Sequence, residues 1–249
     1  MKQFMITVPS GKRLIAKSII ALPQINEALI NHTIVIVSGS TNGYIAEEIL
    51  KKIGQIDGFS KKSFMRGINL GPGKNVTVGN FSESDIVIER GIWKKEKTIF
   101  DVASSLGQHD IILKGANAVD SDRKLAGIQI GNPTLGTSAA ILPAVVGRRT
   151  ELIIPVGLEK RIFGNIGEIA TKLNNSTSTG LRMLPISGTI ITELEAIKLL
   201  AGVSAELIAA GGIKGAEGSC WISVSGTDEQ VDVAGKILSA IANEPNFTD

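Results

Sequence analysis

The sequence predicts an α/β fold in which a parallel sheet is covered by helices and a small subdomain follows. Three observations lead to this prediction. β-Branched apolar runs of strand length alternate with amphipathic stretches of helix length. Clusters of glycine, serine and threonine separate these segments, as in tight loops between strands and helices. The pattern then changes after a polar stretch at residues 174–180, where we expect a linker.

The first 53 residues contain the clearest strand–loop–helix unit. A short β-branched run at 32–37 has the character of a buried parallel strand. The small residues 38–43 follow it as a loop, and an amphipathic helix is expected over 44–53. Before this unit, we expect a strand at 4–8 and helices at 12–21 and 24–30, with a break or kink at Pro23.

The remaining elements continue the alternation. Residues 57–80 are expected to be irregular and to end in a strand near Val76. Together the alternating elements indicate a Rossmann-like sheet in a domain of residues 1–174. Residues 181–249 follow a β-α-β-β-α order, like part of a ferredoxin-like fold, and would form a small lid-like domain. Strands are expected at 85–89, 110–113, 126–130, 151–156, 182–186, 205–209 and 219–224, and helices at 100–106, 138–146, 193–201 and 228–241.

Composition limits the classes of function. The chain has 249 residues, a net charge of +2 and only 4% aromatic residues, which gives neither a bulk attraction to nucleic acid nor a base-stacking platform. The single Cys220 excludes an internal disulfide, and with His32 and His109 it gives no metal-ligand spacing, so we expect no metal and no cofactor. The apolar runs are too short to span a bilayer and no signal peptide is recognisable, so a cytoplasmic location is expected.

Two loops rich in small residues are candidate anion sites. The loop at 38–43 and the loop at 131–137 each lie between a strand and a helix. A helix N-terminus presents free N–H groups, and its dipole favours phosphate or carboxylate. Each loop also fits an ordinary turn, with Asn42 as helix cap in the first. If both end strands of one sheet, they share a crevice at its carboxyl edge. The ligand-binding candidates are Ser38, Gly39, Ser40, Thr41, Asn42, Gly43, Gly136 and Thr137.

Charged residues at two other strand ends are candidate catalytic groups. After the strand at 110–113, Lys114 is a candidate to pair with a ligand anion, Asn117 to line the site, and Asp120 to act as a base or orienting group. After the strand at 151–156, Glu159 is a candidate for proton transfer and Lys160 for holding phosphate. A solvated turn and a surface ion-pair cluster explain the same residues without function.

The stretches 34–41 and 110–120 resemble ribose-5-phosphate isomerase A. More broadly, they are similar to the superfamily that joins this isomerase with glucosamine-6-phosphate deaminase, CoA transferases and initiation factor 2B-like regulatory proteins. The resemblance covers about the first 160 residues in outline and these two stretches in detail. It implies that Ser38, Gly39, Ser40 and Thr41 hold a phosphate, and that the loop ending in Asp120 lines the site.

The chain departs from the isomerase at the residues that carry its chemistry. The first two acidic positions of the isomerase loop fall on Lys114 and Asn117, and its glutamate falls on Ala118. Only the last aspartate is retained, as Asp120. Lysine or asparagine cannot shuttle protons as a carboxylate does, so isomerisation of ribose phosphate is not expected.

Two functions of different classes follow from these patterns. The first is an enzyme that holds a phosphorylated or carboxylated small metabolite and performs isomerase- or transferase-type chemistry. The second is a non-catalytic ligand sensor or regulatory subunit, as in the initiation factor 2B-like branch. The expected partner is a small anionic metabolite, with no nucleic acid and no membrane, and the aliphatic composition is compatible with a homo-oligomer.

Overall fold

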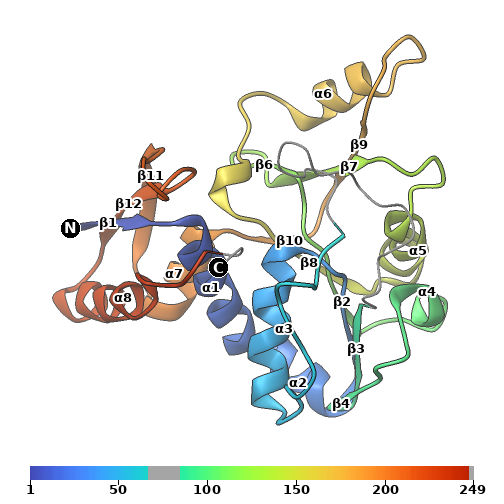
Figure 1. Cartoon of the computed structure of the whole chain (residues 1–249), viewed down its shortest axis with the longest axis horizontal. Coiled ribbons are helices and arrows are strands. Elements are labelled where there is room, and N and C mark those ends of the chain that lie inside the picture. The colour runs from blue at the N-terminus through green and yellow to red at the C-terminus, as the bar shows by residue number, and fades with distance from the viewer. Residues whose placement is uncertain (67–84, 247–249) are drawn as a thin grey trace.

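The computed structural model describes residues 1–66 and 85–246, and it has a mixed α/β fold (Figure 1). Within these residues three β-sheets are present, with six strands in the central sheet and three in each of the others. The strand expected near Val76 lies outside the described residues. The prediction of an α/β protein is confirmed, whereas the arrangement of the strands differs from the one expected.

The central sheet is mixed and not wholly parallel. Its order is β10-β8-β5-β2-β3-β4. The first four strands run parallel to one another, and β3 pairs antiparallel with both of its neighbours, β2 and β4. The expectation that the strand near 85–89 belongs to a parallel sheet is therefore wrong. A buried apolar strand has the same pattern in either direction, so its residues do not encode this choice. The strands are β2 (Thr33–Ile36), β3 (Ile86–Glu89), β4 (Ile92–Trp93), β5 (Ile111–Leu113), β8 (Glu151–Pro155) and β10 (Thr189–Ile191).

Helices cover both faces of this sheet, and strand alternation divides its side chains between two cores. Ile34 and Ile36 pack with α1, α2, α3 and α7, whereas Val35 and Val37 pack with α4 and α5. The fully buried runs therefore have the composition expected of strands that are covered on both sides. The helices are α1 (Val8–Ala21), α2 (Pro23–Asn31), α3 (Ser40–Lys52), α4 (Ile99–Val102), α5 (Thr137–Leu142) and α7 (Glu193–Ala201).

A second sheet is formed by the chain between β5 and β10. It has the order β6-β7-β9, is antiparallel throughout, and packs with α6. The strand expected at 126–130 is present as β7, but it belongs to this sheet and not to the central one. The loop expected over 114–120 ends in a strand, β6, at its last three residues. The elements are β6 (Ala118–Asp120), β7 (Leu125–Ile130), β9 (Arg182–Ile186) and α6 (Ile166–Leu173).

The third sheet joins the two ends of the chain. Its order is β1-β12-β11, and β1 pairs antiparallel with β12, so that Met5 lies opposite Trp221. Its apolar residues continue the core that covers one face of the central sheet, together with α7 and α8 (Figure 1). The expected capping boxes at Thr192 and Thr227 are both present. The elements are β1 (Lys2–Ile6), β11 (Ser204–Ala210), β12 (Cys220–Ser225) and α8 (Asp228–Ile241).

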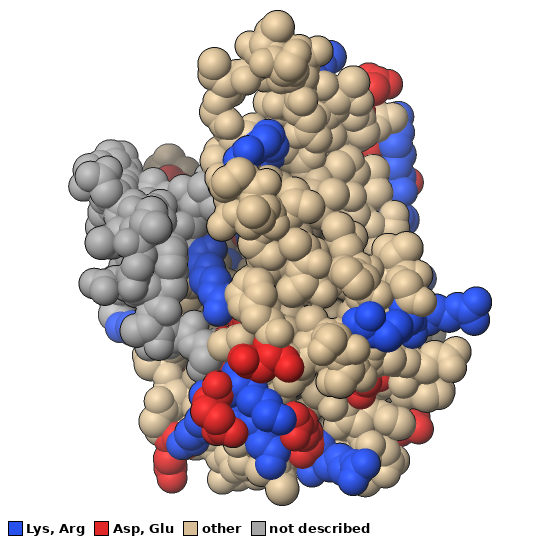
Figure 2. Space-filling model, turned by 90° about the vertical axis from the view of Figure 1, so that its right-hand side faces the viewer, with Lys and Arg blue, Asp and Glu red and all other residues tan. Residues whose placement is uncertain are grey.

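Figure 2 shows the side of the molecule that carries α5, where charged side chains gather at the lower end and are sparse above it. The sequence accounts for this, because the run from 125 to 147 contains no charged residue. In this run α5 continues as a π-helix, Pro143–Gly147. None of the helices in residues 1–66 and 85–246 is long and apolar enough to cross a membrane.

Candidate functional site

The candidate site lies at the carboxyl edge of the four parallel strands. Because β2, β5, β8 and β10 run in the same direction, the residues that follow them meet at one edge of the sheet. Ser38 follows β2, Lys114 follows β5, a 3₁₀ turn (Leu158–Lys160) follows β8, and Glu193 follows β10. The N-terminal half of α1 reaches the same edge, because Lys12 contacts Ser40 at the start of α3.

Helix α3 begins earlier than expected and brings the predicted anion loop into its first turn. It begins at Ser40 and not at Tyr44, and its N-cap is Gly39, with extended backbone angles of φ 172° and ψ 154°. No side chain caps the helix, so its first N–H groups have no side-chain acceptor at the N-cap. Asn42, expected as the cap, lies inside the helix.

Three buried polar atoms of this turn have no hydrogen-bond partner among the described residues. They are the hydroxyl oxygens of Ser38 and Thr41 and the Oδ1 atom of Asn42. The three residues are 8%, 3% and 1% exposed. Buried polar groups are normally hydrogen-bonded, so atoms of this kind at a helix N-terminus point to a polar ligand.

The other end of the Asn42 side chain has a structural role. Its Nδ2 atom donates to the carbonyl oxygen of Val37 at 2.7 Å and to that of Leu113 at 3.0 Å. The side chain therefore ties the ends of β2 and β5 together and fixes α3 relative to both strands. Gly43, the next residue of α3, packs closely against the backbone of Lys61. A Cβ atom at this position would lie 3.2 Å from the Lys61 carbonyl oxygen.

A buried carboxyl group forms the opposite side of the site. Glu193, the first residue of α7, is 3% exposed and its Oε2 atom accepts a hydrogen bond from the Leu158 amide at 2.8 Å. Burial, and then the nearby charge of Glu159, raise the pKa of Glu193 to about 8. The Glu193 carboxyl group is therefore mostly protonated near neutral pH.

Lys12 links this carboxyl pair to the helix N-terminus. Its Nζ atom lies 3.1 Å from the Ser40 hydroxyl, and it interacts electrostatically with both Glu159 and Glu193. Burial lowers the pKa of Lys12 from its ordinary value, while the two carboxyl groups raise it. The side chain therefore stands between the anion-binding turn of α3 and the two glutamates.

Two glycines allow the backbone to approach these glutamates closely. A Cβ atom on Gly11 would lie 2.3 Å from Oε1 of Glu193, and one on Gly157 would lie 1.9 Å from Oε2 of Glu159. Neither position has a positive φ angle, so the close contact and not backbone conformation favours glycine; an added Cβ would have to displace the end of a glutamate side chain, which at Gly11 is the buried Glu193. Gly218, in the β11–β12 hairpin, approaches both Val8 and Glu159, so the third sheet also reaches the site.

Lys114 lies at the other side of the α3 N-terminus, beside Asp85. The Asp85 carboxylate is fully buried and accepts hydrogen bonds from the amides of Ser38, at 2.9 Å, and Ile99, at 3.0 Å. Arg66 pairs with the same carboxylate at 3.0 Å. Burial lowers the pKa of Lys114 to about 8; the charge of Arg66 acts in the same direction and that of Asp85 opposes it.

Several predicted site residues have structural contacts instead. The Asn117 side chain accepts from the Gln129 amide at 3.0 Å and so fastens β6 to β7. The Asp120 carboxylate accepts from the Arg123 amide and from its guanidinium, and closes the β6–β7 turn. Lys160 donates to the carbonyl oxygen of Ala116 at 3.0 Å. Asn117 and Asp120 therefore fasten the β6–β7 hairpin, and Lys160 links the turn after β8 to the loop after β5.

Gly136 and Thr137 do not share a sheet edge with Ser38. The expectation that both small-residue loops end strands of one sheet is wrong, because β7 belongs to the second sheet. Gly136 is the N-cap of α5, which is only six residues long, and Thr137 is its first residue. The sequence pattern of the two loops is alike, but sheet membership depends on pairing between distant segments.

Two hollows lined by described residues lie elsewhere. One, of about 480 Å³, is at the amino edge of the central sheet and is lined by His32, Glu89 and Asp110 among others. Its acids are already bound: Asp110 accepts from the amides of Thr33 and Gly107, and Glu89 pairs with Lys97. The other hollow, of about 210 Å³, lies beside β7 and β9. The unpartnered buried atoms of Ser38, Thr41 and Asn42 are at the carboxyl edge instead.

Sequence reasoning missed Lys12, Asp85 and Glu193. Lys12 was placed inside a predicted helix, and Glu193 was interpreted only as the first residue after the cap Thr192. An acid two residues after the β-branched run 189–191 is the available signal for Glu193. Within the described residues, no group of three or more histidine, cysteine, aspartate and glutamate side chains gathers as a metal site.

Comparisons with family models, with curated proteins and with solved structures found no match for this chain.

Proposed function

We propose that the chain is an enzyme that moves protons on a small phosphorylated or carboxylated metabolite at the carboxyl edge of its central sheet. The observation that carries this proposal is Glu193: a buried carboxyl group, protonated near neutral pH, which Lys12 connects to a helix N-terminus. A purely structural glutamate at a helix start would be ionised and exposed to solvent, because its negative charge then interacts favourably with the helix dipole.

The first turn of α3 is the proposed anion site. Its uncapped amides supply hydrogen-bond donors, and the helix dipole favours negative charge there. The hydroxyl groups of Ser38, Ser40 and Thr41 add further donors, and Lys12 adds positive charge beside Ser40. Gly39 leaves the approach to the backbone open, because no atom lies within 4 Å of the position that a Cβ would take.

The proposed chemistry is general acid–base catalysis by the two glutamates. A catalytic group works best when its pKa lies near the working pH, and burial brings the pKa of Glu193 to about 8. Glu193 would donate a proton to the bound metabolite, and Glu159 would accept one. Two carboxyl groups of different environment commonly divide these roles. This chemistry is of the isomerase type named in the sequence analysis, with Glu193 in place of Asp120.

The finer sequence predictions belong to the same proposal. They are a Rossmann-like layout of the parallel strands, a ferredoxin-like arrangement of the C-terminal segment as a lid, a cytoplasmic location and a homo-oligomer. The resemblance to the ribose-5-phosphate isomerase A superfamily supports the anion site through Ser38, Gly39, Ser40 and Thr41, and it leaves the reaction open.

The first experiment measures binding and proton exchange separately. Inorganic phosphate should raise the thermal unfolding temperature of the wild-type chain, and Ser40→Ala/Thr41→Ala should remove this effect. Dihydroxyacetone phosphate, glycolaldehyde phosphate and pyruvate are then incubated in D₂O, and loss of the proton next to the carbonyl is followed by NMR. We expect exchange with at least one of them, reduced about 100-fold or more in Glu193→Gln.

The possible results separate the two classes of function. Phosphate binding with exchange lost in Glu193→Gln supports the enzyme. Phosphate binding without exchange of any probe contradicts the enzyme and supports the ligand sensor. No stabilisation by phosphate, in a folded protein, contradicts the anion site itself.

A further inference from the structure

Lys114 is a half-buried lysine at the carboxyl edge of the central sheet, and its amino group makes no hydrogen bond to another described side chain. It directly follows β5, the strand between β2 and β8, and its side chain is half-buried. Among the described residues, no hydrogen bond or ion pair joins its Nζ atom to another side chain. Its backbone is fixed, because its amide donates to the carbonyl oxygen of Ile153 at 3.0 Å.

The neighbouring acid is occupied by other donors. Asp85 accepts from the amides of Ser38 and Ile99, and its two oxygens lie 3.0 and 3.2 Å from the Arg66 guanidinium. These groups satisfy the Asp85 oxygens, and the Asp85 charge, which favours the protonated form of Lys114, is outweighed by burial. Burial, together with the positive charge of Arg66, keeps the pKa of Lys114 at about 8, well below the ordinary value of 10.5. A substantial share of the amine is therefore neutral in mildly basic solution.

The position of Lys114 places it next to the proposed anion site. The carbonyl oxygen of Leu113, the residue before it, accepts from the Val37 amide at 2.9 Å and from Asn42 Nδ2 at 3.0 Å. Lys114 therefore begins one residue beyond the point where β5 touches the first turn of α3. Asp85, beside Lys114, is bound to the amide of Ser38 at the end of β2.

We infer that the Lys114 amine is a nucleophile that forms an imine with the carbonyl group of an anionic metabolite bound at the first turn of α3. The inference rests on the proposed function and narrows its substrate class to phosphorylated or carboxylated aldehydes and ketones. The neutral amine adds to the carbonyl carbon and gives a carbinolamine; loss of one water molecule gives the imine, which takes up a proton from solvent and becomes cationic. No electrons are transferred in this step. The positive charge of the imine makes the neighbouring C–H bond acidic. Glu159 would accept the proton that this bond releases.

The test traps the imine on the wild-type chain. The protein is incubated with glyoxylate and cyanoborohydride, which reduces an imine to a stable secondary amine, and the modified lysine is located by peptide mass spectrometry. The exposed Lys236 on α8 is the internal reference. We expect Lys114 to be modified about tenfold faster than Lys236 near pH 8, because the lowered pKa of Lys114 leaves a substantial share of its amine neutral there. Inorganic phosphate should slow the modification of Lys114 and leave Lys236 unchanged.

Two further measurements keep the inference falsifiable. The rate of modification at Lys114 should level off near pH 8. Lys114→Arg, which retains a cation but cannot form an imine, should abolish proton exchange and preserve stabilisation by phosphate; Lys236→Arg is the matched control.

Each outcome bears on a different claim. Equal modification of Lys114 and Lys236, with phosphate binding intact, overturns the imine and leaves the anion site standing. Modification of Lys114 that phosphate does not slow, in a protein that phosphate does not stabilise, overturns the anion site and with it the substrate class. If Lys114→Arg fails to fold, the site of modification on the wild-type chain still decides the question.

Discussion

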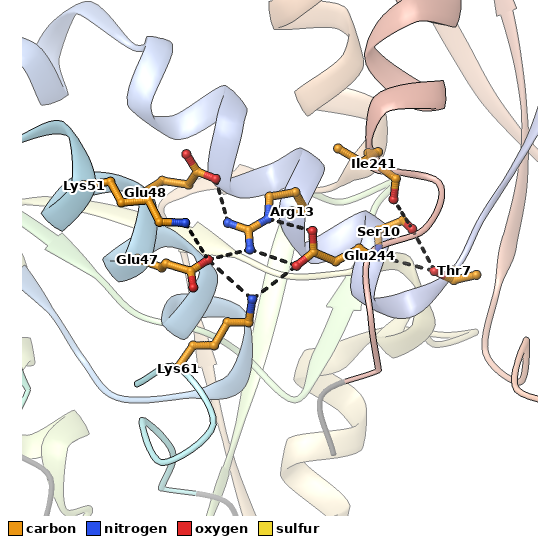
Figure 3. Close-up of polar contacts among 9 residues, drawn as sticks. All are labelled: Thr7, Ser10, Arg13, Glu47, Glu48, Lys51, Lys61, Ile241 and Glu244. Atoms are coloured by element: carbon orange, nitrogen blue, oxygen red, sulfur yellow. Dashed lines mark hydrogen bonds and ion pairs between the residues drawn. The ribbon is translucent and has the colours of Figure 1, made fainter. Parts of the chain in front are cut away.

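Replacing Arg13 by alanine should destabilise the protein severely, because this side chain holds three carboxylates together. Figure 3 shows its guanidinium between Glu47 and Glu48 of α3 and Glu244, which follows α8. The nitrogen–oxygen distances are 2.5 Å to Glu47, 2.6 Å to Glu48 and 2.8 Å to Glu244. The Arg13 side chain is only 8% exposed, so its contacts with the carboxylates are poorly screened by solvent.

The size of the effect follows from what would remain. After Arg13→Ala, Lys61 remains at 3.4 Å from Glu47 and 3.2 Å from Glu244, and the more exposed Lys51 remains at 3.6 Å from Glu47. Removing one partner of a buried ion pair typically costs about 3–5 kcal/mol, because the remaining charges stay buried without compensation. The variant also loses the guanidinium stacked over the Tyr44 ring, 4.9 Å from its centre. We therefore expect a loss of about 4 kcal/mol in the free energy of unfolding.

The assay is urea unfolding followed by circular dichroism at pH 7. Lys2→Ala is the matched control, because it removes an ion pair of similar length, 2.7 Å to Asp232, whose side chains are 56% and 62% exposed; it should leave the unfolding curve unchanged. The reasoning would be refuted if Arg13→Ala shifted the free energy by less than about 1 kcal/mol, because the cluster would then behave as a surface ion pair.

The same cluster predicts acid sensitivity. Burial raises the pKa values of Glu47 and Glu244, but the hydrogen bonds from Arg13 together with the positive charges of Arg13 and Lys61 outweigh it, and both pKa values lie below their ordinary value of 4.5. The folded state therefore binds these protons less readily than the unfolded state, and the stabilisation is complete above about pH 5 and declines as the pH falls. The difference in stability between wild type and Arg13→Ala should narrow over that acidic range.

Three other substitutions test the carboxyl edge. Glu193→Gln should remove a pH dependence of stability whose sign is opposite to that of the Arg13 cluster, because the folded state keeps the Glu193 proton up to about pH 8. The free energy of unfolding of the wild type should therefore fall by up to about 1.4 kcal/mol per pH unit relative to the variant between pH 5 and 8. Urea unfolding curves whose difference does not change across that range would contradict this. Gly11→Ala should destabilise the protein, because its Cβ would lie 2.3 Å from Glu193 Oε1; Glu193→Ala in the same chain should restore part of the loss, and additive effects of the two changes would argue against this contact. Asn42→Ala should cost about 1–3 kcal/mol in thermal unfolding, because the carbonyl oxygen of Val37 loses its side-chain donor; Asn26→Ala, which removes a comparable but less buried amide contact to Leu22, is the control and should cost less.

Local patterns predicted most elements correctly because local interactions determine them. The β-branched runs gave β2, β5 and β8 within one or two residues, and the capping boxes at Thr192 and Thr227 marked the starts of α7 and α8. The start of α3 was placed four residues late, because Ser40, Thr41 and Asn42 favour turns as well as helix starts. Small polar residues therefore identified the right place in the fold but not the right conformation.

The pairing of distant segments could not be predicted in the same way. β1 is separated from β12 by more than 200 residues, and nothing in either strand names the other as its partner. The direction of β3 and the placement of β7 in a second sheet depend on similar long-range choices. The predicted group of Lys114, Asn117 and Asp120 was divided for this reason: β6 pairs with β7, so Asn117 and Asp120 fasten that hairpin while Lys114 remains at the edge of the central sheet.

The long-range pairing also explains how the candidate site is assembled. Because β1 joins the C-terminal sheet, α1 follows it onto the central sheet and contacts both α3 and α7. This contact brings Gly11 against Glu193 and Lys12 against Ser40, two pairs from segments that are far apart in the sequence. The start of α1 packs against the glutamate at the start of α7, and the absence of a side chain at residue 11 allows this close contact. The buried carboxyl group, its lysine and the anion-binding turn thus depend on one packing arrangement, in which the two ends of the chain meet.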